Sequence, residues 1–148
     1  MPYYLSPTQK AYLAGFLDGD GSIYVRLKPN PTYKYGFQVA TYAVLFQSAK
    51  NKDNFKKICN LIKLGYIRKR KDGILEYIIN RKDSLHLFLK IIKPYSILKK
   101  KQIELMIKIL DKKEMVKNKR DFKNLVKIIK RFKDLNYSKR YMRHISTP

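Results

Sequence analysis

Acidic residues are scarce in this chain. The sequence has 11 Asp and Glu residues against 34 Lys and Arg residues, which gives a formal net charge of +23. Among the first 52 residues the only acids are Asp18 and Asp20, which a single glycine separates. So large an excess of positive charge predicts a polyanionic partner, with nucleic acid the first choice and an anionic membrane surface the second.

Cysteine and long apolar runs are also nearly absent. Cys59 is the single cysteine, which excludes an internal disulfide and is typical of an intracellular protein. Because Cys59 falls inside a helical pattern, we expect it to fill the core rather than to act as a nucleophile. No apolar run approaches the roughly 18 residues of a membrane span, so we expect no membrane-embedded segment.

The residues that are present suffice for one folded domain. A chain of 148 residues, 45% of them hydrophobic, can enclose a full core, so the charge does not indicate disorder. Helical spacing predicts helices from Pro7 to about Gly19–Gly21 and over residues 50–64, 81–92, 96–112 and 122–135. A period of two predicts strands over residues 22–28, 36–47, 66–70 and 75–80, the last two joined by a hairpin at Asp72-Gly73. The order α-β-β-α-β-β-α-α-α predicts a single α+β domain over residues 1–148, with its core at about 7–112 and a helical C-terminal extension at about 113–148.

The outward face of the predicted sheet is almost free of acids. Its side chains are basic residues interspersed with Tyr and Gln: Tyr24, Arg26, Lys28, Gln38, Tyr42, Arg68 and Arg70. Arg bonds guanine in bidentate fashion, Gln bonds adenine, Tyr reaches a phosphate or a base edge, and a two-stranded ribbon fits the major groove of DNA. The pattern favours a sheet that binds nucleic acid over a basic face that is merely solvated.

The helix that leads to the two acids has two glycines on one face. Gly15 and Gly19 are four residues apart, and a glycine inside a helix costs about 1 kcal/mol relative to alanine. Close approach of another helix would explain both of them. Since the chain offers one helix of this kind, the simplest partner is the same helix of a second copy, in a twofold homodimer.

Asp18 and Asp20 fall at the predicted C-terminal end of that helix, where the helix dipole disfavours carboxylates. A divalent cation would reverse this effect, and Asp and backbone carbonyl oxygens suit Mg²⁺ or Ca²⁺. In a twofold dimer, two such helix ends would bring paired carboxylates together, as in a two-metal site for phosphodiester cleavage. The acids could instead be caps or salt-bridge partners, or begin an EF-hand loop, although that loop's glycine is missing at Ile23 and its closing Glu at Pro29.

The segment from Leu13 to Gly21 closely resembles the motif that names the LAGLIDADG homing endonucleases. One copy is present, which is typical of the single-motif, homodimeric branch. The resemblance covers about residues 10–110 and includes the tip Lys28-Pro29-Asn30, Gly65-Tyr66 ahead of Arg68 and Arg70, and Pro94 followed by Lys99 and Gln102. It implies the αββαββα homing-endonuclease fold with extra C-terminal helices, in which the antiparallel sheet forms a DNA-binding saddle.

The resemblance also implies a role for individual residues of the catalytic centre. Asp20 would be the catalytic metal ligand, and the carbonyl group of Gly19 would add an oxygen. Gln47 would organise water near the scissile phosphate, and Lys99 would polarise that phosphate or the nucleophilic water. The implied cofactor is Mg²⁺, with Ca²⁺ or Mn²⁺ able to occupy the same sites.

Two larger sets of residues follow from the same resemblance. The implied dimer interface comprises Ala11, Ala14, Gly15, Asp18 and Gly19, where Asp18 caps or supports the paired helices. The implied DNA contacts on the two hairpins are Tyr24, Arg26, Lys28, Asn30, Thr32, Tyr33, Gln38, Tyr42, Arg68, Arg70 and Glu76. Lys139, Arg140 and Arg143 fall in a basic run that is either solvated or a clamp on flanking phosphates. The chain departs from the family at Asn51, where a basic residue is expected, and in a second hairpin that is one residue longer.

The function implied is a site-specific DNA endonuclease that binds double-stranded DNA as a homodimer and makes metal-dependent double-strand breaks with 3′ overhangs at a long, near-palindromic target. We expect metal-assisted hydrolysis without a covalent enzyme intermediate. An RNA-binding intron maturase and a transcription regulator that does not cut use the same fold and remain alternatives. We expect an intracellular location, cytoplasmic in a prokaryote or archaeon and organellar if an organelle intron encodes the chain. No membrane partner and no small-molecule cofactor beyond the metal are expected.

Overall fold

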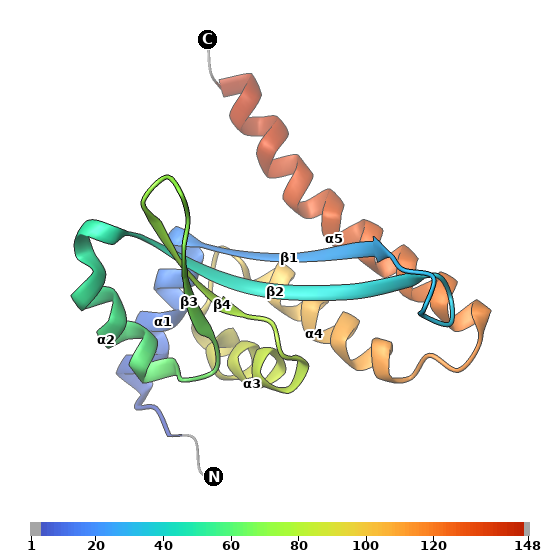
Figure 1. The fold of residues 1–148 in the computed structure, drawn as a ribbon, viewed down its shortest axis with the longest axis horizontal. Coiled ribbons are helices and arrows are strands. Elements are labelled where there is room, and N and C mark those ends of the chain that lie inside the picture. Colours follow the sequence, from blue (N-terminus) through green and yellow to red (C-terminus); the bar gives the residue numbers. More distant parts are fainter. Residues whose placement is uncertain (1–3, 147–148) are drawn as a thin grey trace.

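The structure is a computed structural model that describes the backbone of residues 4–146 and the side chains of residues 4–136. Helices and strands alternate in the predicted order, which confirms the α+β fold class (Figure 1). The elements are α1 (Pro7–Asp20), β1 (Gly21–Pro29), β2 (Phe37–Ser48), α2 (Lys52–Ile62), β3 (Tyr66–Lys69), β4 (Ile74–Ile79), α3 (Lys82–Ile92), α4 (Lys100–Glu114) and α5 (Lys119–Ser146). Short 3₁₀ turns at Ala49–Asn51 and Lys93–Tyr95 precede α2 and follow α3.

The four strands form one antiparallel sheet in the order β1-β2-β4-β3. β1 and β2 pair along the whole of β1, from Gly21 opposite Leu45 to Pro29 opposite Phe37. β4 pairs only with the second part of β2, from Ala43 onward, so the β1–β2 hairpin extends beyond the β3–β4 hairpin. α1, α3 and α4 cover one face of the sheet, and α5 packs against α4 and against β1 (Figure 1).

Local sequence fixes both ends of α1. The Ser6 hydroxyl accepts the N–H of Gln9 and the Gln9 side chain accepts the N–H of Ser6, which forms a capping box. Pro7 lies at the first helical position, where the sequence predicts the helix to begin. The helix ends at Asp20, and β1 begins at the next residue, Gly21. A Cβ atom at Gly21 would collide with the Leu17 side chain and lie 2.8 Å from the Leu17 carbonyl oxygen. Glycine therefore lets the chain pass from helix to strand without a linker.

The core lies between the sheet and the helices. Its largest fully buried side chains are Phe55, Phe88, Phe132, Leu13, Leu17, Leu45, Ile62, Leu75, Ile79, Leu85, Leu89 and Ile92. Cys59 is buried beside them, as predicted, and burial raises the pKa of its thiol to about 11. The thiol therefore stays protonated and unreactive at neutral pH.

Over the described part of the chain, no helix combines the length and apolar character needed to cross a membrane.

Two polar side chains from the helices complete the backbone hydrogen bonding of the β1–β2 hairpin. Asn136 of α5 donates from Nδ2 to the carbonyl oxygen of Ile23 on the edge strand β1, at 3.1 Å. Lys113 of α4 donates from Nζ to the carbonyl oxygen of Val39, at 2.9 Å, where β2 extends past β4. Burial lowers the pKa of Lys113. These bonds satisfy carbonyls that the sheet leaves unpaired and hold the long hairpin against the helices.

Three element boundaries differ from the sequence-based expectation. The helix expected from Ser96 begins only at Lys100, because Ser96 has an extended backbone and residues 97–99 form a turn. The N–H groups of that turn bind the Asp18 carboxylate. The helix expected over residues 50–64 ends at Ile62, and Lys63 after it is in the left-handed conformation, with φ of 52°. Gly65 packs closely on the neighbouring strand, since a Cβ atom there would collide with the Ile78 carbonyl oxygen. The last helix is longer than the expected 122–135 and spans residues 119–146.

Candidate nucleic-acid interface

The face of the sheet opposite the helices carries the predicted basic and aromatic side chains. Because side chains alternate along a strand, the buried Ile23 and Val25 lie on the core face and Tyr24 and Arg26 on the other. The register places six of the predicted residues directly opposite each other in three pairs: Tyr24 with Tyr42, Lys28 with Gln38, and Arg68 with Glu76. We call this face the basic face. Its contact with DNA stays a prediction, but the structure brings the predicted residues together.

Four side chains of the first hairpin form one contact cluster on the basic face. The rings of Tyr24 and Tyr42 stack, with centroids 4.7 Å apart and planes inclined by 20°. The Arg26 guanidinium lies 5.4 Å from the Tyr24 ring centroid, and the Lys28 ammonium lies 5.8 Å from the Tyr42 ring centroid. Lys28 also donates from Nζ to the Tyr42 hydroxyl at 3.1 Å. We call these four residues the tyrosine cluster.

The second hairpin places carboxylates beside its two arginines. Glu76 has a side chain only 13% exposed, and its Oε1 lies 3.4 Å from Nε of Arg68 without forming a hydrogen bond. Arg70 forms a closer pair with Asp72 in the turn, with Nη2 and Oδ2 2.6 Å apart. The Arg70–Asp72 pair is exposed, and ion pairs of this kind add little to stability. Both carboxylates lie beside arginines of the basic face.

The tip of the first hairpin is fixed by its own polar side chains. The carboxamide oxygen of Asn30 accepts hydrogen bonds from the backbone N–H of Thr32 at 3.0 Å and from its hydroxyl at 2.7 Å. The Asn30 N–H donates to the carbonyl of Gly36, which has a φ of 79° that favours glycine. Tyr33 remains exposed at the tip. Asn30 and Thr32 thus shape the loop, which presents Tyr33 to solvent.

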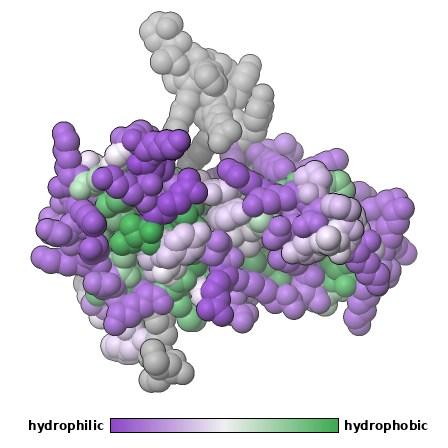
Figure 2. All heavy atoms as spheres, in the orientation of Figure 1, coloured by the Kyte–Doolittle hydropathy of each residue, from purple (hydrophilic) through white to green (hydrophobic). Residues whose placement is uncertain are grey.

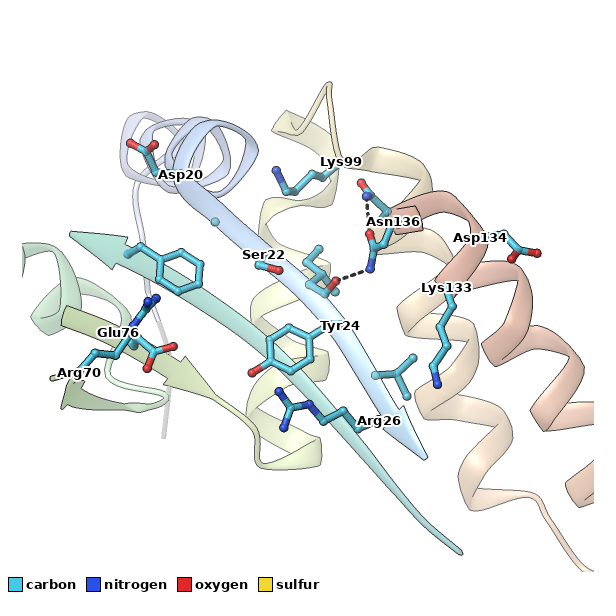
Figure 3. A pocket seen from close by; sticks show the side chains of 15 residues that line it. Asp20, Ser22, Tyr24, Arg26, Arg70, Glu76, Lys99, Lys133, Asp134 and Asn136 are labelled. Carbon is cyan, nitrogen blue, oxygen red and sulfur yellow. Dashed lines mark hydrogen bonds between the residues drawn. The ribbon is translucent and has the colours of Figure 1, made fainter. Parts of the chain in front are cut away.

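An open hollow of about 1090 Å³ lies between the basic face, the end of α1 and α5 (Figure 3). Its lining joins residues far apart in the sequence: Asp20, Tyr24, Arg26, Arg70, Glu76, Lys99, Gln102, Lys133, Asp134 and Asn136 are among them. Figure 3 shows the carboxylate of Asp20 and the ammonium of Lys99 at the same end of this hollow. An anionic chain lying on the basic face would therefore pass this acid and this base.

The two acids of the motif have different environments. Asp18 accepts hydrogen bonds from the Ser96 hydroxyl at 2.5 Å and from the backbone N–H groups of Ile97, Leu98 and Lys99 at 2.8, 3.0 and 3.2 Å. Partial burial raises the pKa of Asp18, but these hydrogen bonds outweigh it, and the pKa lies below its ordinary value. Asp18 therefore ties the end of α1 to the turn that begins α4, as an acid with a capping role would.

Asp20 has no such role inside the chain. Its side chain is exposed, and among the described residues it has no hydrogen-bond or ion-pair partner. Within residues 4–136 there is also no group of three or more His, Cys, Asp or Glu side chains that could hold a metal ion. A single chain therefore offers Asp20 as an exposed, hard oxygen donor at a helix end, and one chain's carboxylates do not complete a metal site.

Of the other two predicted catalytic residues, Lys99 lines the hollow and Gln47 does not. Lys99 is 8% exposed, lines the hollow and donates from Nζ to the carbonyl oxygen of Asp18 at 2.8 Å. The structure thus brings Lys99 together with Asp20. Gln47 lies near the end of β2 on the core-facing side of the strand, and its Oε1 accepts the N–H of Ser48 at 2.9 Å. Gln47 is not among the residues that line the hollow.

Three of the five residues predicted for the dimer face of α1 are exposed, Asp18 is half-buried and Ala14 is buried. Ala11, Gly15 and Gly19 are exposed, and Cβ atoms built on both glycines meet nothing within 4 Å. Ala14 is fully buried in the core of its own chain, so its inclusion in the interface is wrong. It lies on the core side of the helix with Leu13 and Leu17.

Sequence reasoning missed the residues that α5 contributes. Lys133, Asp134 and Asn136 line the hollow, and the Asn136 carboxamide oxygen accepts a hydrogen bond from Gln102 at 2.9 Å. The signal that could have found Asn136 is its position four residues after Phe132, which places it on the packed face of the helix. Lys139, Arg140 and Arg143 fall in the last part of α5, where side chains lie outside the described residues.

Comparison with known proteins connects these features to a family. A model described as LAGLIDADG endonuclease matches residues 13–109. The chain is 36% identical over 110 residues to DNA endonuclease I-CreI of Chlamydomonas reinhardtii, covering 74% of this chain and 67% of that protein. It is 33% identical over 102 residues to DNA endonuclease I-CvuI of Chlorella vulgaris, covering 69% of this chain and 63% of that protein.

Solved structures match the fold as well. A crystal structure of I-CvuI bound to the I-CreI target with Mg matches with a TM-score of 0.81 at 28% identity, covering 86% of this chain and 82% of that one. A second crystal structure, which contains I-CvuI with its own target and Ca, matches this chain with a TM-score of 0.80.

The helix-backed antiparallel saddle and the motif at the end of α1 define a protein of the homing-endonuclease class. The chain belongs to the LAGLIDADG endonuclease family. The predicted family, fold and class of activity, a homing endonuclease that hydrolyses DNA, are therefore confirmed.

Proposed function

We propose that this chain acts as a homodimer that binds a long, near-palindromic double-stranded DNA target and cuts both strands in the presence of a divalent metal ion, leaving 3′ overhangs. The observation that carries the proposal is the exposed carboxylate of Asp20, which has no partner within residues 4–136 and lies at one end of a basic hollow in a chain of net charge +23. The relatives support it, since the I-CvuI structures contain DNA together with Mg or Ca.

The donor set of the chain fits a hard divalent cation. Asp20 would hold the ion with its carboxylate and Gly19 with its carbonyl oxygen, and oxygen donors suit Mg²⁺, Mn²⁺ and Ca²⁺. When bound, such an ion stabilises negative charge on the attacking and leaving oxygens of phosphodiester hydrolysis. We propose Mg²⁺ as the working ion.

Lys99 would act on the phosphate directly. Its ammonium is held near the end of α1 by the Asp18 carbonyl and lines the hollow beside Asp20. A fixed positive charge at this place would stabilise the extra negative charge of the transition state. The hydrogen bonds from Ser96 and three backbone N–H groups keep Asp18 ionised and hold the turn that carries Lys99. Gln47 would have to turn its carboxamide away from Ser48 to orient water.

The homodimer is supported by the exposed face of α1. Gly15 and Gly19 lower the stability of the helix, and no neighbouring atom of the same chain lies within 4 Å of a Cβ built at either position. Close approach of a second helix would explain both glycines. Exposed apolar side chains continue this face into the turn before α4, where Ile97 is 84% and Leu98 is 69% exposed. A twofold contact over this patch would bring two Asp20 carboxylates toward each other and complete a site that one chain lacks.

Asp20→Asn tests the proposal. Loss of a residue that only supports a metal ligand lowers activity by roughly 10- to 100-fold. Because Asp20 would itself be a ligand, we expect the rate of double-strand cleavage to fall by more than this. DNA affinity should be retained, because the basic face supplies it. A plasmid-cleavage assay with Mg²⁺, read beside a gel-shift titration, measures both quantities.

Asp134→Asn is the matched control. Asp134 is an exposed acid that lines the same hollow from α5, so this variant removes the same charge from the other side. It should cut like the wild type. Wild-type cutting by Asp20→Asn would refute the assignment, and RNA binding without DNA cleavage by the wild type would favour the maturase alternative.

A further inference from the structure

The tyrosine cluster has a feature that the proposed catalytic centre does not use. Lys28, Tyr24 and Tyr42 lie on the basic face, but only Tyr24 and Arg26 of the cluster reach the lining of the hollow. The Lys28 to Tyr42 hydrogen bond lies farther along the hairpin, among exposed side chains. It therefore belongs to the surface that would meet the DNA away from the scissile phosphates.

The chemistry of this hydrogen bond fixes the role of the Tyr42 hydroxyl. A lysine ammonium has three donors and no acceptor, so the Tyr42 oxygen must accept in the bond of 3.1 Å between them. The hydroxyl hydrogen then has to be donated elsewhere. Together Lys28 and Tyr42 offer outward donors and no strong, unoccupied acceptor.

The surrounding contacts hold this pair in place. Tyr42 stacks on Tyr24 directly across the strands, with ring centroids 4.7 Å apart. Arg26 covers the Tyr24 ring, and the residue opposite Arg26 is the small Ala40, which leaves room for it. Partial burial raises the pKa of Tyr24, so the phenol of Tyr24 stays protonated at neutral pH. A stacked aromatic pair loses little side-chain freedom on binding, which favours a defined contact over a diffuse one.

We propose that Lys28 and Tyr42 act as one donor-only unit that reads the guanine of a single G·C pair in each half of the DNA target. In the major groove, guanine presents two acceptors, N7 and O6, whereas adenine presents an acceptor beside a donor and cytosine presents a donor. A unit with donors alone matches guanine and leaves the adenine and cytosine amino groups unpaired. This inference rests on the proposed function, because it assigns base preference to the same DNA-binding face.

A doped-library experiment tests the inference. Duplexes based on the targets crystallised with I-CvuI, randomised position by position, are selected for binding and for cleavage by the wild type, Tyr42→Phe and Lys28→Met. Tyr42→Phe keeps the stacked ring and removes only the hydroxyl. We expect it to lose about tenfold of the guanine preference at one position and its symmetry mate, with other positions unchanged. Lys28→Met frees the Tyr42 oxygen to accept, so the same position should broaden toward adenine and cytosine.

Lys34→Met is the matched control. Lys34 is exposed and lies 5.7 Å from the ring centroid of Tyr35, so it is a second lysine–tyrosine contact with the same charge but without a bond to the hydroxyl. It should leave the base profile unchanged. Thermal unfolding of Tyr42→Phe should match the wild type.

The outcomes distinguish failure of the guanine-reading inference from failure of the proposed endonuclease function. A uniform loss of affinity across all sequences in Tyr42→Phe would mean that the pair contacts phosphate and would overturn the inference. An unchanged profile would overturn it as well. In both cases the wild type still selects and cuts DNA, so the proposed function stands. If the wild type neither selects nor cuts any duplex, the proposed function fails and the inference fails with it.

Discussion

The two aspartates of the motif show how much one position changes a carboxylate. Asp18 and Asp20 are two residues apart on the last turn of α1. Asp18 faces Ser96 and the N–H groups ahead of α4, so its charge is used inside the chain. Asp20 lies at the edge of the hollow without a partner among the described residues. The alternative that the acids of the motif are caps or salt-bridge partners therefore holds for Asp18 and fails for Asp20.

Asp18→Asn should destabilise the protomer and change its pH dependence. The carboxamide offers its backbone donors one oxygen instead of two, and we expect a loss of about 1 kcal/mol, as for loss of a helix cap. The pKa of Asp18 is lower in the folded chain than its ordinary value of 3.8. Its stabilisation is therefore present above that value and disappears as the pH falls through the folded pKa.

Urea unfolding followed from neutral pH down to about pH 3 measures this effect. The stability difference between the wild type and Asp18→Asn should shrink at the acid end. A difference that stays constant over the whole range would contradict the role given to the Asp18 carboxylate. Asp134→Asn, which removes an exposed acid, is the control for general charge effects.

Sequence reasoning reached some residues and not others for identifiable reasons. Period-two alternation found the basic face, because each strand buries one side. The assignment of Ala14 to the dimer face failed because the two sides of a helix this apolar look alike until the core is known. Asn136 was missed because its partner, the Ile23 carbonyl, is more than a hundred residues away in the sequence. The spacing from Phe132 places Asn136 on the packed face of α5, but no local pattern indicates a partner so far away in the sequence.

At the scale of elements, α1 does two tasks with opposite faces. Leu13, Ala14 and Leu17 are buried in the core of the chain. Gly15 and Gly19 leave the other face flat and bare. The element order and the hairpin at Asp72-Gly73 were predictable, since each depends on residues close in sequence. The turn before α4 was not, because its N–H groups bind Asp18 of a helix about 80 residues away.

Gly15→Ala should affect the protomer and the dimer in opposite directions. Alanine is about 1 kcal/mol better than glycine inside a helix, and its Cβ meets nothing within 4 Å, so the isolated protomer should become more stable. The same methyl group would separate two paired helices and weaken the dimer. Sedimentation equilibrium gives the dimer affinity, and thermal unfolding of dilute protein gives the protomer stability.

Gly21→Ala provides the contrast. Here the added Cβ would lie 2.8 Å from the Leu17 carbonyl oxygen, so overpacking should cost about 1–3 kcal/mol in the protomer itself. A Gly15→Ala protein with unchanged dimer affinity would show that the bare face of α1 is not the contact between copies.

At the scale of the whole molecule, the surface is hydrophilic and the net charge is strongly positive. The visible surface is dominated by hydrophilic side chains, with apolar patches between them (Figure 2). With a net charge of +23, attraction to a polyanion acts over the whole chain, and the few acids serve local purposes. The charge makes binding strong, whereas the arrangement on the basic face makes it selective.

DNA affinity should therefore fall steeply with salt. The slope of log affinity against log salt should be about −0.9 for each phosphate contact, because binding releases condensed counterions. A fluorescence anisotropy titration over a range of KCl measures it. Tyr42→Phe should keep the wild-type slope, since it removes no charge, and Lys28→Met should change it by about one contact at most. A flat titration would contradict binding through the basic face.

The direct junction between α1 and β1 has a mechanical consequence. Strand follows helix at Gly21 with no intervening loop, and the side chain that a larger residue would carry has no space there. If two copies pair through α1, the angle at which their helices cross is passed on unchanged to their sheets. One rigid joint would then set how far apart the two halves of a DNA site must be, so a rotation of the pair by a few degrees would alter which spacing is accepted.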